Sequence, residues 1–435
     1  MEVLLKDIVI IFVLSMVVLL ICHRLKVPTI VGFLITGLLL GPYGLGLITA
    51  DKEVKDLAEI GVVMLLFTIG IEFSLKDLIR IKRAVLMGGS LQVLLTLAAT
   101  FVFASQFAYG PGESVFAGFL VALSSTAIVL KLLQDRAEIE SPHGQTTLGI
   151  LIYQDIVIVP MILLTPLLAG KAGGPGTSLP LLLAKAVGII FLVILSAEYI
   201  VPKVLYQIAR TRSRELFLLS IVVMCLAVAW LTHSLGLSLA LGAFLAGLTI
   251  SESEYSHQAL SSVLPFRDLF TSFFFISIGM LLDIRFLFEK PALVFFLALG
   301  VLLTKSFLAM CTTLLLGLPL RTAILVGLGL CQVGEFSFIL AEEGAKYGLL
   351  GGDIFQLFLA VSVLTMAATP FIIILGDRIV GAVLRFPLPQ KLKSGLYPLQ
   401  GLTDAKKRVK LKGHLIVVGF GINGKNVTRA AGLAG

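Results

Sequence analysis

The chain has 435 residues, of which 58% are hydrophobic and 14% are charged, and its formal net charge is +8. The mean hydropathy of +1.04 excludes an ordinary soluble domain, because a soluble core cannot bury so much apolar surface. The composition therefore predicts an all-α membrane protein with many spans. The four cysteines lie in apolar stretches without the spacing of a metal site or a disulfide framework: Cys22, Cys225, Cys311 and Cys331.

The apolar runs predict about thirteen transmembrane helices, each able to cross roughly 30 Å of hydrocarbon. The first run, in "MEVLLKDIVIIFVLSMVVLLICHRLK", is followed by basic residues and lacks the small residues of a signal-peptidase site, so we interpret it as a retained span. The predicted spans are centred on Leu14, Leu38, Leu65, Ala98, Ala122, Val157, Phe191, Met224, Phe244, Phe275, Lys305, Leu330 and Leu364.

Basic residues predict how the chain is oriented in the bilayer. Two clusters follow the third and seventh predicted spans, and the tail after the last span adds "KKRVKLK". By the positive-inside rule, the N-terminus is expected outside and the C-terminus in the cytoplasm. The two loop clusters are Lys76, Arg80, Lys82 and Arg83, and Lys203, Arg210, Arg212 and Arg214.

An internal repeat predicts the architecture of the membrane part. "GFLITGLLLG" at Gly32 resembles "GAFLAGLTIS" at Gly242, which pairs Gly37 with Gly247 at an offset of 210 residues. "FTIGIEFSLKDL" at Phe67 resembles "ISIGMLLDIRFL" at Ile276, which pairs Gly70 with Gly279 at an offset of 209. Seven predicted spans separate the copies, and an odd number gives them opposite orientations. Inverted-topology repeats are typical of secondary transporters, whose substrates bind near the midplane on interrupted helices.

Polar residues occur at mid-depth in four of the predicted spans. A charge in hydrocarbon costs at least about 2.5–3.5 kcal/mol, so such residues are functional candidates. The fifth and twelfth spans lie seven apart, and both break their apolar run at matching depth. They predict two crossing unwound helices, whose freed carbonyls and hydroxyls would hold a cation. The residues are Ser124, Ser125 and Thr126 in "ALSSTAIVL", Asp155 in "LGILIYQDIVIVPMILL", Lys305 in "VLLTKSFLAM" and Glu335 in "GLGLCQVGEFSF".

Some of these residues have a structural alternative. A Ser-Ser-Thr step in a membrane helix is often a packing contact between helices. Lys305 is equally well explained as a structural counter-charge. Glu198 lies near Lys203 at the end of a predicted span, so we expect it to reach the membrane surface. Asp155 has no basic residue near it in its own span, which favours a functional role.

Five segments resemble those of the Kef-type potassium/proton antiporters, in the monovalent cation:proton antiporter superfamily. They are "GFLITGLLLGP", "ALSSTAIVL", "ILIYQDIVIVPMILL", "SFFFISIGMLLD" and "LGLCQVGEFSFIL", and they occur in the family's order. The Gln154-Asp155 pair resembles the Kef branch rather than relatives with Asp-Asp or Asn-Asp at this place. The resemblance implies a thirteen-helix homodimer with a dimerisation domain and a moving core domain, a sodium/proton antiporter-like fold, in the inner membrane of a prokaryote.

The resemblance also implies roles for individual residues. The ion-binding aspartate matches Asp155, beside Gln154, and the first unwound helix matches Ser124, Ser125 and Thr126. The second unwound helix matches Gln332, Gly334 and Glu335, and the membrane lysine of the wider superfamily matches Lys305.

The chemistry of a lone buried carboxylate predicts exchange. It holds either a proton or a cation, and the two states exclude each other. Because Gln154 is neutral, we expect one proton per monovalent cation: electroneutral exchange of K⁺ for H⁺ by alternating access, with Gln154 offering its carbonyl. An Na⁺/H⁺ antiporter is the nearest alternative, since selectivity depends on cavity size and carbonyl number; a ligand-gated K⁺ efflux channel and a membrane sensor are further alternatives. We expect neither enzymatic activity nor a nucleic-acid partner.

The chain changes character after the membrane domain, which we place at residues 1–383. The Pro, Gly and Lys content of residues 384–412 predicts a basic linker on the cytoplasmic side, which lies along the anionic lipid surface. The last segment, residues 413–435, is a glycine followed by "HLIVVGFGINGKNVTRAAGLAG". Its pattern predicts a short strand, then a turn with Gly419, Gly421 and Gly424, then the start of a helix. A dinucleotide-binding fingerprint requires this order of elements. We expect the truncated start of a Rossmann-like regulatory domain, with no cofactor bound to this fragment. The Kef resemblance implies a nucleotide of NAD(H) or AMP type for an intact domain.

Overall fold

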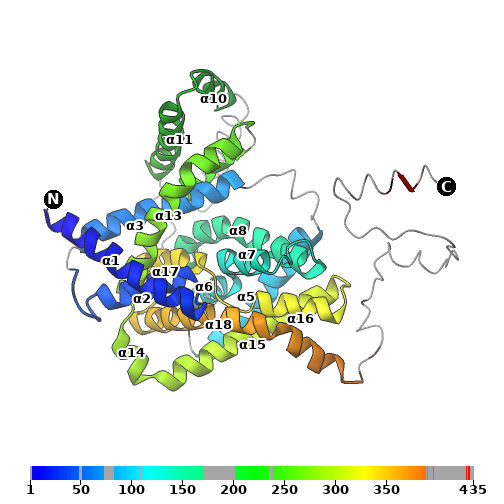
Figure 1. Ribbon diagram of the computed structural model, residues 1–435. Coiled ribbons are helices and arrows are strands. Elements are labelled where there is room, and N and C mark those ends of the chain that lie inside the picture. The colour runs from blue at the N-terminus through cyan, green and yellow to red at the C-terminus, as the bar shows by residue number, and fades with distance from the viewer. Residues whose placement is uncertain are drawn as a thin grey trace.

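The computed structural model describes residues 2–48, 51–72, 83–107, 109–170, 201–234, 239–251 and 253–387, and the single positions 389, 395, 428, 430 and 431. All regular elements within these ranges are helical (Figure 1). Several predictions fall outside the described residues and stay predictions: the span around Phe191, Glu198, the basic positions Lys76, Arg80 and Lys82, and the glycines Gly419, Gly421 and Gly424.

The described helices have the following bounds, in chain order. They are α1 (Glu2–Leu25), α2 (Thr29–Leu40), α3 (Asp51–Glu72), the π-helix η1 (Arg83–Gly89), α5 (Ser90–Ser105), α6 (Pro111–Ala122), α7 (Thr126–Asp135), α8 (Pro142–Leu168), α10 (Val201–Arg210), α11 (Arg214–Ser234), α12 (Leu239–Ser251), α13 (Ser256–Met280), α14 (Ile284–Glu289), α15 (Pro291–Leu315), α16 (Leu320–Gly329), α17 (Phe336–Tyr347) and α18 (Gly352–Leu384).

The all-α membrane fold predicted from the composition is confirmed. Among the described residues, eight helical stretches are long and apolar enough to cross a membrane, and the shorter apolar helices include α2 and α16. Every predicted span centre falls on a helix or at a helix break, except Phe191, which lies outside the described ranges. The sixth predicted span, centred on Val157, is α8, which begins at Pro142 behind the N-cap Ser141.

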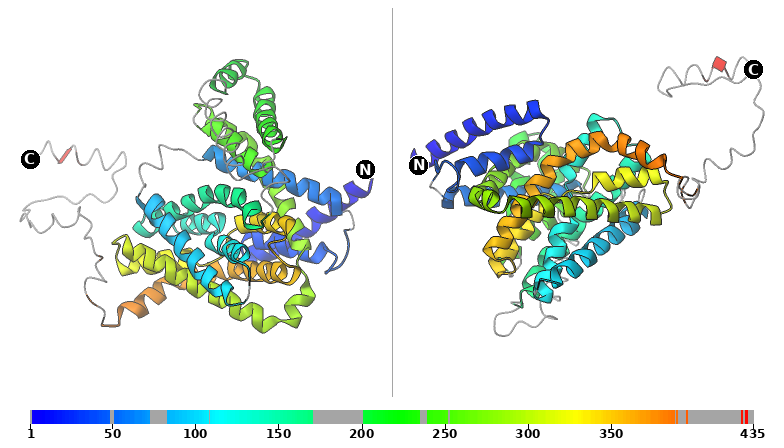
Figure 2. Two further views of the ribbon diagram at one scale, coloured as in Figure 1. Left: turned by 180° about the vertical axis from the view of Figure 1, so that it is seen from behind. Right: turned by 90° about the horizontal axis from the view of Figure 1, so that it is seen from below.

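The contacts between helices divide them into two groups. One group joins α1, α2 and α3 to α10, α11, α12 and α13; the other joins η1, α5, α6, α7 and α8 to α15, α16, α17 and α18. Figure 2 shows α1 and α2 on the opposite side of the bundle from the end of α18. Each group contains helices from both halves of the chain, as interlocked repeats require.

Two glycine pairs hold the first group together. A Cβ on Gly279 would collide with Leu34 O and lie 3.0 Å from Gly37 Cα, so α13 crosses α2 backbone to backbone. A Cβ on Gly247 would collide with Phe67 O and lie 2.8 Å from Gly70 Cα, so α12 crosses α3 in the same way. The sequence repeat pairs Gly37 with Gly247 and Gly70 with Gly279. Replacing each glycine by its repeat partner turns the first crossing into the second. The two crossings are therefore equivalent contacts between the two copies of the repeat.

An ion-pair network lies at the end of the second group where α7 meets α8. Arg136 lies 3.1 Å from Glu138 and 3.1 Å from Asp377, and Arg321 also lies 3.1 Å from Asp377. Exposed pairs of this kind contribute at most about 1 kcal/mol each. They join the α7–α8 hairpin of the first repeat to α16 and α18 of the second.

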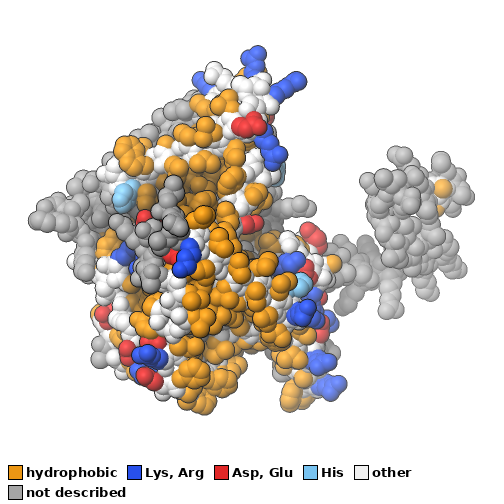
Figure 3. Space-filling view, turned by 60° about the vertical axis from the view of Figure 1, so that its left-hand side comes forward, with side chains coloured by type: hydrophobic (Ala, Val, Ile, Leu, Met, Phe, Trp, Pro, Cys, Tyr) orange, Lys and Arg blue, Asp and Glu red, His pale blue; other side chains and the backbone are white. Residues whose placement is uncertain are grey.

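The lateral surface is strongly apolar. Figure 3 shows a broad band of hydrophobic side chains down the middle of this face, with most of the charged side chains near its edges. Trp230 on α11 is 69% exposed, and Phe296 and Leu303 on α15 are 67% and 62% exposed. Large apolar side chains exposed along several helices fit a surface that faces lipid rather than water.

Candidate functional site

Two interrupted helices cross in the second group. α6 ends at Ala122 and α7 begins at Thr126, while α16 ends at Gly329 and α17 begins at Phe336. We call the two breaks, residues 123–125 and 330–335, and the residues that contact them the crossing. The prediction of two unwound helices from the polar steps in the fifth and twelfth spans is confirmed. Each break exposes backbone groups that have no partner within their own helix.

The two breaks bind each other directly. Gly334 N donates to Leu123 O at 3.1 Å, and the Ser124 hydroxyl donates to Leu330 O at 2.9 Å. A Cβ on Gly334 would lie only 2.7 Å from the Ser124 backbone, so this close approach requires glycine. Each break therefore provides a hydrogen-bond partner for a backbone group of the other break.

Lys305 occupies the side of the crossing where α6 and α16 end. Its side chain is fully buried, and Nζ donates to Leu123 O and to Gln332 O, both at 2.6 Å. A cation at the C-terminal ends of two helices is stabilised by their dipoles. Sequence reasoning expected the freed carbonyls to serve the transported cation. In the structure the Lys305 ammonium group takes two of them, because it lies between both helix ends.

Asp155 lies on the opposite side, where α7 begins. The Thr126 hydroxyl, in the first residue of α7, donates to the two Asp155 carboxylate oxygens at 2.9 and 3.2 Å. The side chain is half-buried. Across the described ranges, no Lys or Arg nitrogen forms an ion pair with it. The carboxylate is thus held by a hydroxyl at the start of α7 and has no basic ion-pair partner in the described part of the chain.

Glu335 lies at the same helix N-terminus. Its Oε1 accepts from Ala127 N at 3.0 Å, whereas Oε2 is buried without a hydrogen-bond partner. The residue is 4% exposed, and its charge interacts electrostatically with that of Asp155. Sequence reasoning placed Glu335 on the second unwound helix. It did not predict that the Glu335 carboxylate caps α7, the helix that follows the first break.

The remaining predicted site residues hold the breaks together rather than face Asp155. Gln154 is 1% exposed; its Oε1 accepts from Ser124 N at 2.7 Å and its Nε2 donates to Gln92 Oε1 at 2.6 Å. The Ser125 hydroxyl accepts from Ile128 N at 3.2 Å as the N-cap of α7. In this structure the Gln154 oxygen is bound to the first break, and the expectation that it offers its carbonyl to the cation stays a prediction. Of the four other residues predicted to bind the ion with Asp155, only Thr126 is hydrogen-bonded to it.

Gln92 on α5 is a site residue that sequence reasoning missed. It is fully buried, and its Nε2 donates to Ala122 O at 3.3 Å and to the Thr96 hydroxyl at 3.1 Å. Its oxygen accepts from Gln154, which fixes which end of that amide faces Ser124. The available signal was a lone amide in the charge-free run "SLQVLLTLAATF". A buried amide in such a run needs several partners.

A profile of the family described as "Sodium/hydrogen exchanger, transmembrane" matches residues 9–375, which include the whole crossing. The chain belongs to the sodium/hydrogen exchanger family. Its fold is also similar to that of the sodium proton antiporter MjNhaP1 from Methanocaldococcus jannaschii, solved at pH 8, with a TM-score of 0.64. That match covers 88% of this chain and 99% of MjNhaP1 at 17% identity, which shows a shared fold.

Relatives of this exchanger-family chain are similar over most of its length. "K(+) efflux antiporter 2, chloroplastic" of Arabidopsis thaliana is 36% identical over 416 residues, which cover 93% of this chain and 34% of the plant protein. "Putative cation/proton antiporter YbaL" of Escherichia coli (strain K12) is 33% identical over 374 residues, which cover 84% and 67%. The chain thus spans about a third of the length of the plant relative.

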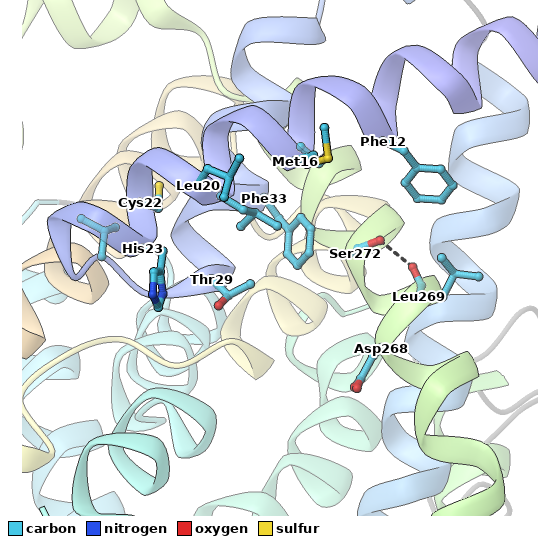
Figure 4. A pocket seen from close by; sticks show the side chains of 13 residues that line it. Phe12, Met16, Leu20, Cys22, His23, Thr29, Phe33, Asp268, Leu269 and Ser272 are labelled. Carbon is cyan, nitrogen blue, oxygen red and sulfur yellow. Dashed lines mark hydrogen bonds between the residues drawn. The ribbon is translucent and has the colours of Figure 1, made fainter. Parts of the chain in front are cut away.

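A groove on this exchanger-family chain lies away from the crossing. It has a volume of about 590 Å³ and lies between α1, α2 and α13. Figure 4 shows its mostly apolar lining, including Phe12, Met16 and Phe33, with Ser272 donating to Leu269 O beside it. The groove contains none of the residues that contact Asp155, so its lining does not describe an ion site.

The Gln92–Gln154 contact gives a testable expectation for the exchanger-family crossing. We expect Gln92→Leu to lower the free energy of unfolding by about 1–3 kcal/mol, because Ala122 O and the Gln154 amide lose buried partners. The same change at Gln145, an exposed residue on α8, serves as the matched control. Thermal unfolding of the purified protein in detergent measures both. Equal stability of the two variants would contradict a role for Gln92 in holding the first break.

Proposed function

We propose that this chain is the membrane domain of a secondary antiporter that exchanges a monovalent cation, K⁺, for H⁺ by alternating access. One observation carries the proposal: Asp155 is a half-buried carboxylate at the start of α7, held by Thr126 and without a basic ion-pair partner in the described part of the chain. A carboxylate held in this way needs a positive charge from outside the protein, and either a proton or a cation supplies it.

Exclusive occupancy couples the two ions. When H⁺ occupies Asp155, the neutral carboxyl group no longer attracts a cation; when a cation is bound, its charge opposes protonation. Alternate exposure of this one site to the two faces of the membrane then exchanges one ion for the other. If H⁺ and the cation did not exclude each other, the cation would simply flow down its gradient, as in a channel. A channel does not need a lone titratable carboxylate.

K⁺ is the proposed cation, and Na⁺ is the nearest alternative. The support for K⁺ is the Gln154-Asp155 pair together with the K⁺ efflux antiporters among the relatives. Na⁺ stays the alternative because the sodium proton antiporter MjNhaP1 shares the fold. Selectivity depends on how many oxygens surround the bound ion and at what radius.

The wider organisation is also part of the proposal. We place the chain as a homodimer in the inner membrane of a prokaryote, with its C-terminus in the cytoplasm. Residues 384–412 serve as a basic linker and residues 413–435 as the start of a regulatory domain that binds NAD(H) or AMP through Gly419, Gly421 and Gly424. The excess of basic residues after the last span and the glycine motif support this part.

Proteoliposomes that contain the purified protein test the proposed exchange. K⁺ and Na⁺ gradients are imposed in turn, with choline as the inert control, while a trapped dye reports internal pH. An outward K⁺ gradient is expected to acidify the lumen, and Na⁺ to do so more weakly. No pH change with either cation would refute antiport, and a larger response to Na⁺ would replace K⁺ as the substrate.

The pH dependence of the exchange gives a second expectation. Because H⁺ and K⁺ compete for Asp155, the apparent KM for K⁺ should rise as the pH falls, by up to about tenfold per pH unit for competition at one site. Initial rates over a range of K⁺ concentrations at each pH, equal on both sides of the membrane, measure it. A KM for K⁺ that stays constant across pH would contradict a shared site.

A further inference from the structure

Three charged side chains lie at the crossing, and two of them are deeply buried. Lys305 is 0% exposed and Glu335 is 4% exposed, whereas Asp155 is half-buried. In the described parts of α5–α8 and α15–α18, these are the only two charged side chains that are buried. Glu72 on α3 also interacts electrostatically with Asp155, but it is 52% exposed and lies 3.8 Å from Arg267. Glu72 shares Arg267 with Asp268, and its exposure lets solvent screen its charge.

Each buried charge lies at the helix ends that stabilise it. Lys305 donates to Leu123 O and Gln332 O, where α6 and α16 end with partial negative charge. Glu335 accepts from Ala127 N, where α7 begins with partial positive charge. The breaks are short, so the two charges lie on either side of the same few backbone groups. Glu335 Oε2 has no hydrogen bond, which leaves long-range attraction to a cation as its compensation.

The formal charges decide what the site can hold. Two carboxylates and one ammonium group leave a single negative charge at the crossing. One bound proton or one monovalent cation brings the buried set to neutrality, and either ion does so equally. Without Glu335, Asp155 and Lys305 alone would already be neutral, and a bound cation would leave an uncompensated positive charge in a medium where this is costly.

We infer that Glu335 is the fixed partner charge of Lys305 across the crossing, and that this pair sets the free charge of the transport site to that of Asp155 alone. The inference rests on the proposed antiport and deepens it: with the pair in place, the site is neutral whether it holds the proton or the cation, so neither loaded state carries net charge across the membrane. Glu335 acts through the electric field at the site and not by contact with the ion. Gln154, neutral and bound to the first break, contributes no charge.

A charge-rescue experiment in proteoliposomes tests this inference. The variants are Glu335→Gln, Lys305→Gln and the two combined; the glutamine at 305 keeps a donor for the two carbonyls. Each single change is expected to lower K⁺-driven proton movement by about tenfold or more, because it unbalances a buried charge set. The double variant restores the balance and is expected to recover exchange at least about fivefold over the worse single variant. Asp155→Asn in the double background should remove the recovery.

The dependence on membrane potential gives a readout that a purely structural role would not move. With the potential clamped by an ionophore for a third ion, wild-type and double-variant rates should not respond to it, while any residual exchange by a single variant should. An active wild type with an unaffected Glu335→Gln variant, or a double variant no better than the worse single, would overturn the inference. An inactive wild type would instead overturn the proposed antiport.

Protein stability is checked separately so that the result stays decisive. If Lys305→Gln does not yield folded protein, Glu335→Asp is compared with Glu335→Gln. Because Glu335→Asp keeps the negative charge, it is expected to exchange at least about tenfold faster than Glu335→Gln. Equal rates for these two variants would overturn the role of the charge.

Discussion

Asp155→Asn is expected to abolish cation-driven proton movement in proteoliposomes. Asparagine keeps the shape of the side chain and an oxygen that accepts from Thr126, so α7 can still begin as it does now. It cannot carry a proton or balance a cation. Loss of one partner from a buried ion pair costs about 3–5 kcal/mol, so the loss of exchange should be roughly 100-fold or more.

The matched control is Asp135→Asn at the end of α7. Asp135 is 56% exposed and pairs with Lys131 at 2.8 Å one turn earlier, so this change alters the same functional group outside the crossing. It should leave exchange within about twofold of wild type, since exposed helical pairs contribute only a few tenths of a kcal/mol. Exchange by Asp155→Asn at the wild-type rate would refute the proposed mechanism.

Gly279→Ala is expected to be among the most destabilising changes to the fold. The new Cβ would collide with Leu34 O and press on Gly37, where α13 and α2 touch through their backbones. Neither contact is the end of a flexible side chain, so the helices themselves must separate. Overpacking of this kind costs about 1–3 kcal/mol, and here it breaks a contact that the repeat makes twice.

Gly300→Ala on α15 provides the control for this prediction. A Cβ at Gly300 would meet nothing within 4 Å beyond the local backbone of its own helix, and alanine is the better helix former by about 1 kcal/mol. Thermal unfolding in detergent should therefore show a lower melting temperature for Gly279→Ala and an unchanged or higher one for Gly300→Ala. Equal melting temperatures would contradict the close crossing of α2 and α13.

Much of the fold follows from patterns that are local in the sequence. The length of the apolar runs predicted the spans, and the breaks appeared as small or polar steps in otherwise apolar helices. The repeat also paired Gly37 with Gly247 and Gly70 with Gly279. Which glycine touches which was not predictable, because Gly37 packs on Gly279 and not on its own repeat partner. That contact depends on how the inverted copies interlock.

The site was predictable as a set of residues but not as a set of partners. Asp155 and Lys305 were conspicuous because a charge in an apolar run is rare. Their separation onto opposite helix ends depends on the direction in which each broken helix crosses the other. Gln92 carries no charge, and its link to Gln154 spans 62 positions of sequence, so residue type alone gave no reason to join them.

The central claim is that a proton gradient can drive K⁺ against its own gradient through this chain. Proteoliposomes with equal K⁺ on both sides and an acidic lumen test it, with a tracer following K⁺ and Asp155→Asn as the reference. K⁺ should accumulate inside as protons leave, and a proton ionophore should abolish the accumulation. K⁺ flux that only runs down its own gradient, and that ignores the imposed pH difference, would contradict antiport and indicate a channel.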